Sequence, residues 1–343
     1  MKFSLIGIDL AKNVFQVCAL DKADKVALNR SMSRQKLSIF LAQAEATTVV
    51  MEACCSSHYW GRVAQEHGHQ VKLIPAQHVK PFLKGNKTDA ADALAICEAS
   101  RRPNIHFVPV KTPGQQDLQL LSKHRSRLIS QRTAASNQLR AFAAEYGVIF
   151  SKGFRKLISE VPEVLEADHP LLTPVAREVI SELYHEIFSL QKRITSLQDR
   201  LADLASEQEA YARLIEVPGF GRVVAAAYLG ALGDGKQFNN GRQSAAWLGL
   251  VPRQHGTGGR VQLMGITKRG DRELRAMLIH GARAVMRWAD RRDDALGHWL
   301  CQLRARRGPQ KAIVALANKM ARIAWAVVAN GERFDMDRAF AHP

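Results

Sequence analysis

Four carboxylates in the first third of the chain have the positions of a metal site. Asp9 lies near the end of an apolar, β-branched run, and Glu52 directly follows the apolar run Thr47–Met51. Asp89 and Asp92 are three residues apart, so a helix places both on one face. Buried strands exclude unpaired charges, and clustered carboxylates repel one another unless a hard cation binds them. The pattern therefore predicts that these four residues hold Mg²⁺.

Such a site suits phosphodiester chemistry. Two Mg²⁺ ions about 4 Å apart activate the attacking oxygen and stabilise the leaving oxygen. For Asp89 and Asp92 alone, an ordinary helix start is an equally good interpretation, since acidic side chains there favour the helix dipole. Asp9 and Glu52, at the ends of predicted strands, favour the metal site.

Hydrophobic periodicity identifies the elements that must position these carboxylates. We expect strands at residues 3–10, 13–20, 25–30, 47–51 and 70–74, and helices at residues 35–44, 58–67 and 89–100. This order predicts an α/β domain over residues 1–112, built on a central mixed sheet.

The charge of the chain predicts a polyanionic partner. Its 343 residues carry 49 basic and 32 acidic side chains, a net charge of +17, of which +11 falls on residues 214–343. A membrane is the weaker interpretation, because Lys319 and Arg322 interrupt the best apolar run, residues 312–329. No signal peptide is expected at the start. Five cysteines without a CxxC pair favour a reduced, cytoplasmic protein with no structural zinc.

Residues 113–213 predict a helical region. Gln115–Tyr146 contains no proline and precedes a glycine, so we expect one long helix, and the prolines between residues 162 and 174 predict a linker. On the long helix, Arg125, Arg132 and Arg140 suit either a nucleic-acid contact or a solvated face.

A heptad pattern begins at residue 180. Apolar residues alternate in steps of three and four over nearly four heptads, at Ile180, Leu183, Ile187, Leu190, Ile194, Leu197, Leu201 and Leu204. This seam predicts a coiled coil. Dimerisation through the seam is the favoured interpretation, and packing against the 115–146 helix within one chain is the alternative.

The last third carries two patterns typical of nucleic-acid contacts. In the first, Pro-Gly-Phe-Gly, Gly219 and Gly221 free backbone N–H groups ahead of Arg222, which predicts a helix-hairpin-helix element that binds a DNA phosphate. A plain helical turn is the alternative. In the second, residues 256–259 predict a flexible glycine-rich loop that a phosphate backbone can approach closely. Basic residues flank this loop: Arg253 precedes it, and Arg260, Lys268, Arg269 and Arg272 follow it.

Together these motifs resemble the DEDD transposases of bacterial insertion sequences, the bridge-RNA-guided recombinases related to the pilin-gene invertase. The matching segments are Gly-Ile-Asp9-Leu-Ala-Lys, Met-Glu52-Ala-Cys, Ser57-His-Tyr-Trp60, Lys87-Thr-Asp89-Ala-Ala-Asp92, Trp247-Leu-Gly-Leu-Val-Pro-Arg-Gln and Lys268-Arg-Gly270. The resemblance extends over almost the whole chain. It implies a RuvC-like, RNase H-type fold whose four carboxylates hold Mg²⁺. It also implies that the protein binds donor and target DNA and a structured guide RNA, and that it assembles as a homodimer or homotetramer. Thr88 replaces an asparagine that is common in the family, and threonine caps a helix nearly as well.

The resemblance also implies a covalent mechanism. In these transposases a serine after Pro-Arg-Gln-x attacks DNA, and the resulting phosphoserine conserves the energy needed for rejoining. Here Gly256 occupies the position of that serine, and Thr257 is the remaining hydroxyl of the loop. Ser244 is a more remote candidate. Catalysis by Thr257 and loss of strand transfer both remain open.

The sequence therefore predicts a multidomain α/β plus α protein, a Mg²⁺-dependent DNA recombinase of a mobile element. Its parts are a RuvC-like domain (residues 1–112), a helical coiled-coil region (113–213) and a mainly helical transposase domain (214–343). A hydrolytic nuclease that uses the carboxylates alone and a DNA-binding protein that has lost catalysis are the two rival functions.

Overall fold

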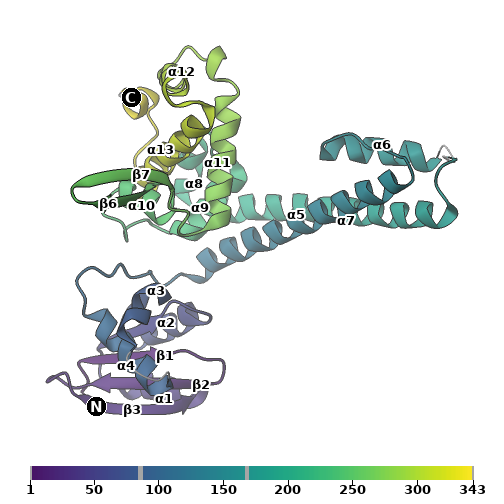
Figure 1. Ribbon diagram of the computed structural model, residues 1–343. Coiled ribbons are helices and arrows are strands. Elements are labelled where there is room, and N and C mark those ends of the chain that lie inside the picture. Colours follow the sequence, from purple (N-terminus) through teal and green to yellow (C-terminus); the bar gives the residue numbers. More distant parts are fainter. Residues whose placement is uncertain (1, 84–87, 167–169, 342–343) are drawn as a thin grey trace. The chain divides into compact units, whose positions relative to one another are not determined.

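The computed structural model describes residues 2–83, 88–166 and 170–341. The chain divides into two compact units, Met1–Pro113 and Gly114–Pro343 (Figure 1). Each unit has its own hydrophobic clusters, and each is described by itself.

The first unit is built on a five-stranded mixed sheet. Its strands are β1 (Leu5–Asp9), β2 (Val14–Leu20), β3 (Val26–Ser33), β4 (Thr48–Glu52) and β5 (Gln70–Ile74), in the order β3-β2-β1-β4-β5. Strands β1, β2 and β3 pair antiparallel through short turns, whereas β1, β4 and β5 pair parallel and need the crossover connections that helices supply. The predicted α/β class with a central mixed sheet is confirmed.

Helices cover both faces of this sheet. Helices α1 (Arg34–Gln43) and α2 (Ser57–Glu66) pack on the face that carries Ile6 and Ile8. Helix α4 (Asp89–Ser100) packs on the opposite face, with Leu5 and Val50; the short α3 (Ala76–Val79) and a 3₁₀ turn (Lys80–Phe82) precede it. Because side chains alternate along a strand, Asp9 and Glu52 project from the face that α4 covers.

The second unit is mainly helical, as expected for residues 113–213 and 214–343. Its helices are α5 (Pro113–Glu145), α6 (Phe154–Glu166), α7 (Pro174–Ser206), α8 (Glu209–Ile215), α9 (Arg222–Leu232), α10 (Gly241–Trp247), α11 (Arg272–Met286), α12 (Ala295–Arg307), α13 (Pro309–Ala329) and α14 (Met336–Phe340). A 3₁₀ turn (Ala289–Arg291) lies between α11 and α12, and strands β6 (Pro252–Thr257) and β7 (Arg260–Ile266) form a separate two-stranded sheet.

One hydrophobic cluster joins Leu118 of α5 and Leu201 of α7 to helices α8–α13, so residues on both sides of position 213 share a core. Helix α13 is long and apolar enough to cross a membrane. However, Leu316 and Met320 on one of its faces are fully buried in this cluster, as in the core helix of a globular domain.

The heptad seam of α7 is buried within the chain. Ile180 and Ile187 pack in one cluster with residues of α5 and α6, and Leu190, Ile194 and Leu197 pack in another with Leu128 of α5. Helices α5 and α7 run side by side in Figure 1. The chain's own helices therefore cover the seam. This is the predicted alternative, packing within one chain, rather than dimerisation through the seam.

The prolines predicted to mark a linker lie partly in helices instead. Pro162 lies inside α6, and Pro174 is the first residue of α7, where the missing N–H would have no partner in any case. Thr173 caps the same helix by accepting from the Ala176 N–H, 3.2 Å away. Residues 167–169 lie outside the described residues.

Arginines of α5 contact neighbouring parts of the second unit. Neither of their two predicted roles, a nucleic-acid contact or a solvated face, includes these contacts. Arg132 donates to the side chain of Gln191 on α7, and its guanidinium lies 4.4 Å from the ring centre of Phe154. Arg140 donates to the Gly153 carbonyl at 2.9 Å. Burial lowers the pKa of Arg125. Arg132 and Arg140 are thus engaged by the chain itself.

We expect Ile187→Asp to destabilise the second unit by about 3–5 kcal/mol, because it buries an unpaired charge between α5, α6 and α7. Phe188→Asp is the matched control: the neighbouring side chain is 56% exposed, so the cost should stay within about 0.5 kcal/mol. Thermal unfolding followed by circular dichroism measures both. Equal losses in the two variants would contradict the packing of this seam.

Candidate metal centre and nucleic-acid surface

Three of the four predicted carboxylates come together in the first unit. Asp9 at the end of β1 and Asp89 and Asp92 in the first turn of α4 each offer an oxygen, and these oxygens lie within 4.8 Å of one another. A strand end and a helix start that are 80 positions apart in the sequence therefore meet at the carboxyl end of the central strand.

Two local features hold α4 against the strand. Thr88 caps the helix by accepting from the Ala91 N–H at 3.2 Å, so the predicted capping role of this threonine is confirmed. Gly7 lies beneath the helix: a Cβ there would stand 2.4 Å from the Cys97 sulfur and 2.9 Å from the Ala93 carbonyl oxygen. The absence of a side chain lets α4 approach β1 closely enough to bring the carboxylates together.

Glu52 lies outside this close group but on the same side of the sheet. Strand β4 runs parallel to β1, with Ile8 opposite Met51, so Glu52 ends the neighbouring strand one position beyond that pair. Partial burial and the charges of Glu52 and Asp9 raise the pKa of the Cys54 thiol to about 11. Both carboxylates therefore act on one neighbouring group, and Cys54 stays a neutral thiol at physiological pH.

The donor set fits a hard divalent cation. All of its ligand atoms are carboxylate oxygens, the type that Mg²⁺ prefers. The Oδ1 atom of Asp92 is buried and has no hydrogen-bond partner in the described part of the chain. A buried polar atom without a partner costs free energy, and a bound cation would remove that cost.

A polar network that sequence reasoning missed supports the start of α4. Gln16, opposite Asp9 in the β1–β2 register, donates to Asn29 at 2.7 Å and accepts from Ser31 at 2.8 Å. Asn29 in turn donates to the Ala90 carbonyl at 3.1 Å, beside Asp89. A glutamine inside the apolar run of β2 was the available signal.

We expect Gly7→Ala to lower the free energy of unfolding by about 1–3 kcal/mol, since the added methyl group overpacks the contact between β1 and α4. Any DNA cleavage that depends on the carboxylates should fall as well, although no carboxylate is changed. Adding Cys97→Ala removes the nearer of the two clashing atoms and should restore part of both losses. Chemical denaturation and a cleavage assay measure them, and a Gly7→Ala protein as stable as the parent would contradict this packing.

In the second unit, the turn from α8 to α9 contains the predicted Pro-Gly-Phe-Gly element. Gly219 has φ +84°, and a Cβ there would stand 3.0 Å from the backbone of Gly281 on α11, so the turn packs tightly. Gly221 is the N-cap of α9, and a Cβ on it would meet nothing within 4 Å. Arg222 is exposed and lies 3.8 Å from Asp199 and Asp203.

The predicted flexible loop is a β-hairpin. Gly256 and Thr257 end β6, Arg260 begins β7, and Gly258 and Gly259 form the two-residue turn with φ +55° and +77°. Two consecutive positive φ values define the turn type that joins twisted antiparallel strands most easily. The glycines therefore serve the turn, and Thr257 occupies a regular strand position.

The register assigns these residues to faces of the hairpin. Thr257 pairs with Arg260 and His255 with Gln262, so these four side chains share one face. Position 256 alternates to the other face, opposite Val261. Thr257 and Arg260 are both exposed.

Ser244 lies on α10, as expected, but is fully buried, and its hydroxyl lies 3.5 Å from that of Tyr228. This placement removes it from the candidates for a nucleophile, because a phosphate could not reach it without opening the core.

Arg275 fixes the basic segment after the hairpin, which contains Lys268 and Arg269. No signal in the sequence indicates this role of Arg275. Its buried guanidinium donates to the carbonyls of Leu248 at 3.0 Å and Arg269 at 2.7 Å. Lys268 and Arg269 are thereby fixed beside α10, and Arg272 begins α11. Arg253 lies on β6 and is exposed.

Comparisons with known proteins agree with these observations. A family model for DEDD transposases of the IS110 type, described as "Transposase", matches residues 6–147, and one described as "Transposase IS116/IS110/IS902 family" matches residues 211–296. A "Probable family 20 transposase" of Pseudomonas aeruginosa is 45% identical over 96% of this chain and 97% of its own. The "Transposase for insertion sequence element IS1111A" of Coxiella burnetii is 40% identical over 96% and 91%. A "Pilin gene-inverting protein" of Moraxella bovis is 24% identical over 98% of both chains.

Proposed function

This chain belongs to the IS116/IS110/IS902 family of insertion-sequence transposases, and we propose that it cuts and rejoins DNA by a Mg²⁺-dependent, covalent mechanism. A DNA transposase moves phosphodiester bonds, which requires a group that attacks phosphorus and a means of offsetting charge as a bond breaks. The chain offers both, one in each unit.

The gathering of Asp9, Asp89 and Asp92 carries the proposal. With Glu52 on the neighbouring strand, these residues would hold Mg²⁺, which when bound supplies charge stabilisation at the reacting phosphate. The strand order β3-β2-β1-β4-β5, with three antiparallel strands followed by two parallel ones, supports a RuvC-like, RNase H-type domain.

In the proposed reaction, Thr257 is the nucleophile. Its hydroxyl loses a proton to solvent, its oxygen bonds to phosphorus, and one bridging P–O bond of the DNA breaks, so that the released oxygen takes up a proton from water. Arg260, its cross-strand partner, would pair with the non-bridging oxygens of the same phosphate. Rejoining reverses these steps without an external energy source.

The other predicted contacts would position the nucleic acid. Backbone N–H groups at Gly219 and Gly221, with Arg222, suit a phosphate in a helix-hairpin-helix arrangement. The exposed charges of Arg253, Lys268, Arg269 and Arg272 would hold further phosphates of donor and target DNA and of a structured guide RNA.

We further propose that the protein works in the cytoplasm as a homodimer or homotetramer. Its five cysteines are free thiols, as a reducing compartment would maintain them. Because α5 and α6 cover the seam of α7, the contact between copies would use another surface.

A hydrolytic nuclease is the second candidate, favoured by one observation: Gly256 supplies no hydroxyl at the position where the family resemblance implies a serine nucleophile. The two functions separate on a denaturing gel with labelled DNA. Strand transfer leaves a protein–DNA adduct, hydrolysis gives Mg²⁺-dependent cutting without an adduct, and a protein that only binds DNA gives neither.

A further inference from the structure

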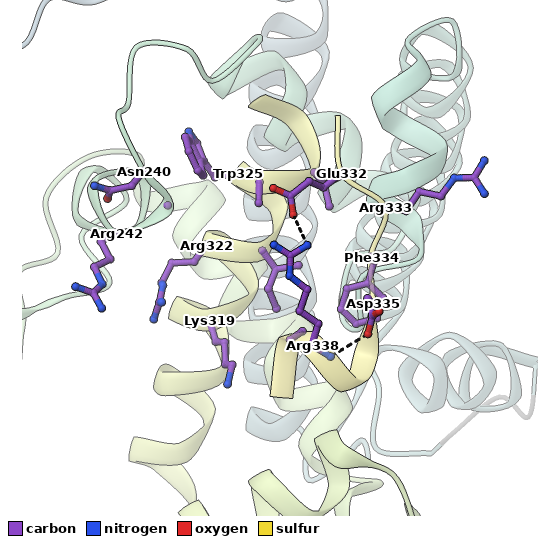
Figure 2. A pocket seen from close by; sticks show the side chains of 15 residues that line it. Asn240, Arg242, Lys319, Arg322, Trp325, Glu332, Arg333, Phe334, Asp335 and Arg338 are labelled. Atoms are coloured by element: carbon purple, nitrogen blue, oxygen red, sulfur yellow. Dashed lines mark hydrogen bonds and ion pairs between the residues drawn. The ribbon is translucent and has the colours of Figure 1, made fainter. Parts of the chain in front are cut away.

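The C-terminal part of the second unit contains a cavity of about 450 Å³ that no predicted site includes. The start of α10, one side of α13 and the segment from Glu332 to Ala339 line it (Figure 2). Its size is that of a small-molecule site, larger than a single ordered water requires.

The cavity has an excess of positive charge. Five basic side chains line it, against the two carboxylates of Glu332 and Asp335. Both carboxylates are engaged nearby: Glu332 pairs with Arg338 at 3.2 Å, and Asp335 caps α14 by accepting from the Arg338 N–H at 2.9 Å. Neither carboxylate is therefore paired with Arg242 or Arg322.

Three of these cations extend to the same side of the cavity. Figure 2 shows the side chains of Arg242, Lys319 and Arg322 pointing in one direction, whereas Arg333 points away on the opposite side. Arg242 and Arg322 come close because Gly241 packs directly on α13: a Cβ at Gly241 would stand 2.8 Å from the Arg322 carbonyl oxygen.

Like charges in this group raise one another's energy. Burial and the neighbouring charge of Arg322 lower the pKa of Lys319, whose ammonium lies 4.7 Å from the ring centre of Trp299. Within the described residues, the structure gives the guanidinium groups of Arg242 and Arg322 no hydrogen bond or ion pair. An anion between the three cations would relieve this repulsion, as a cation does for clustered carboxylates.

We propose that Arg242, Lys319 and Arg322 form a phosphate-binding site for a nucleic-acid backbone, separate from the β6–β7 hairpin. Arginine presents paired donors that match the oxygens of a phosphodiester, and two of them flanking a lysine suit a strand that passes along α13. The site rests on the proposed action on nucleic acid and adds a specific anchoring point, whose contacts carry no sequence information.

The test measures binding alone, on the full-length protein without divalent metal, so that cleavage plays no part. Fluorescence anisotropy follows a labelled short DNA duplex and a labelled RNA hairpin through a salt titration. Arg242→Gln and Arg322→Gln should each reduce the slope of log affinity against log salt by about 0.9 on the duplex, which is about eightfold in affinity at 0.1 M salt. Arg333→Gln, a charge on the same cavity that points away, is the matched control and should keep the parent slope.

The two probes distinguish the sources of the phosphate. A reduced slope on the duplex assigns the site to DNA, and one on the hairpin alone assigns it to RNA. Arg242→Lys and Arg322→Lys should keep most of the slope, which separates lost charge from lost fold. Parent slopes on both probes, or equal losses in Arg333→Gln, overturn the site. This experiment measures binding and not cleavage, so a negative result would not bear on the carboxylate mechanism. Conversely, a carboxylate variant that still cleaves DNA would not bear on this phosphate-binding site.

Discussion

Asp9→Asn and Asp92→Asn are each expected to reduce DNA cleavage by at least about 10²–10³-fold, the loss that follows removal of one charge-stabilising group from an active site. Each change removes a carboxylate from a group whose oxygens lie within 4.8 Å. The amide keeps the shape of the side chain but loses the charge that holds a cation. Cleavage of labelled DNA with Mg²⁺ present measures the effect.

Binding of DNA should stay close to that of the parent in both variants, because the charge that attracts phosphate lies mainly in residues 214–343. Asp24→Asn is the matched control: Asp24 belongs to the same unit but forms an exposed ion pair with Arg101, so cleavage should be unchanged. Full cleavage by Asp9→Asn and Asp92→Asn would remove the basis of the metal site.

Thr257→Ala is expected to eliminate the protein–DNA adduct, since no other hydroxyl shares the face of the hairpin with Arg260 and His255. Thr257→Ser should form the adduct faster than the parent, because it keeps the oxygen and removes a methyl group that narrows the angle of attack. The adduct is measured on a denaturing gel over time.

Gly256→Ser is the informative control. Position 256 alternates to the opposite face, so a serine added there should not replace the hydroxyl lost in Thr257→Ala. An adduct that persists in Thr257→Ala would place the nucleophile elsewhere. An adduct rescued by Gly256→Ser would show instead that the DNA approaches the other face of the strand.

The parts of the fold that the sequence predicts best are those set by local periodicity. Alternating apolar residues locate β1 and β2, and the spacing of Asp89 and Asp92 with Thr88 before them locates the start of α4. The convergence of Asp9 with this helix followed from placing charges at the ends of apolar runs. Such patterns act over a few residues, so they survive without knowledge of the tertiary structure.

The parts that it could not predict depend on which surfaces meet. A heptad seam shows that α7 buries an apolar face, but not whether α5 or a second copy covers it. The burial of Ser244 and the clamp made by Arg275 arise from contacts between separate elements. The hairpin is a different case, because the sequence does contain a signal for it. Gly258-Gly259 between strand-forming residues is typical of a two-residue hairpin turn, whereas the prediction of a flexible loop treats these glycines only as a source of flexibility.

The β6–β7 hairpin has a consequence for handling the protein. It forms a sheet of its own, so in the described chain both outer strand edges lack a further strand, and Val261 and Leu263 are 67% and 62% exposed. Open edges with apolar side chains template aggregation, and charged residues are the common safeguard. We therefore expect Arg253 and Arg260 to limit aggregation as well, so replacing both with neutral residues should lower the protein concentration at which precipitation begins.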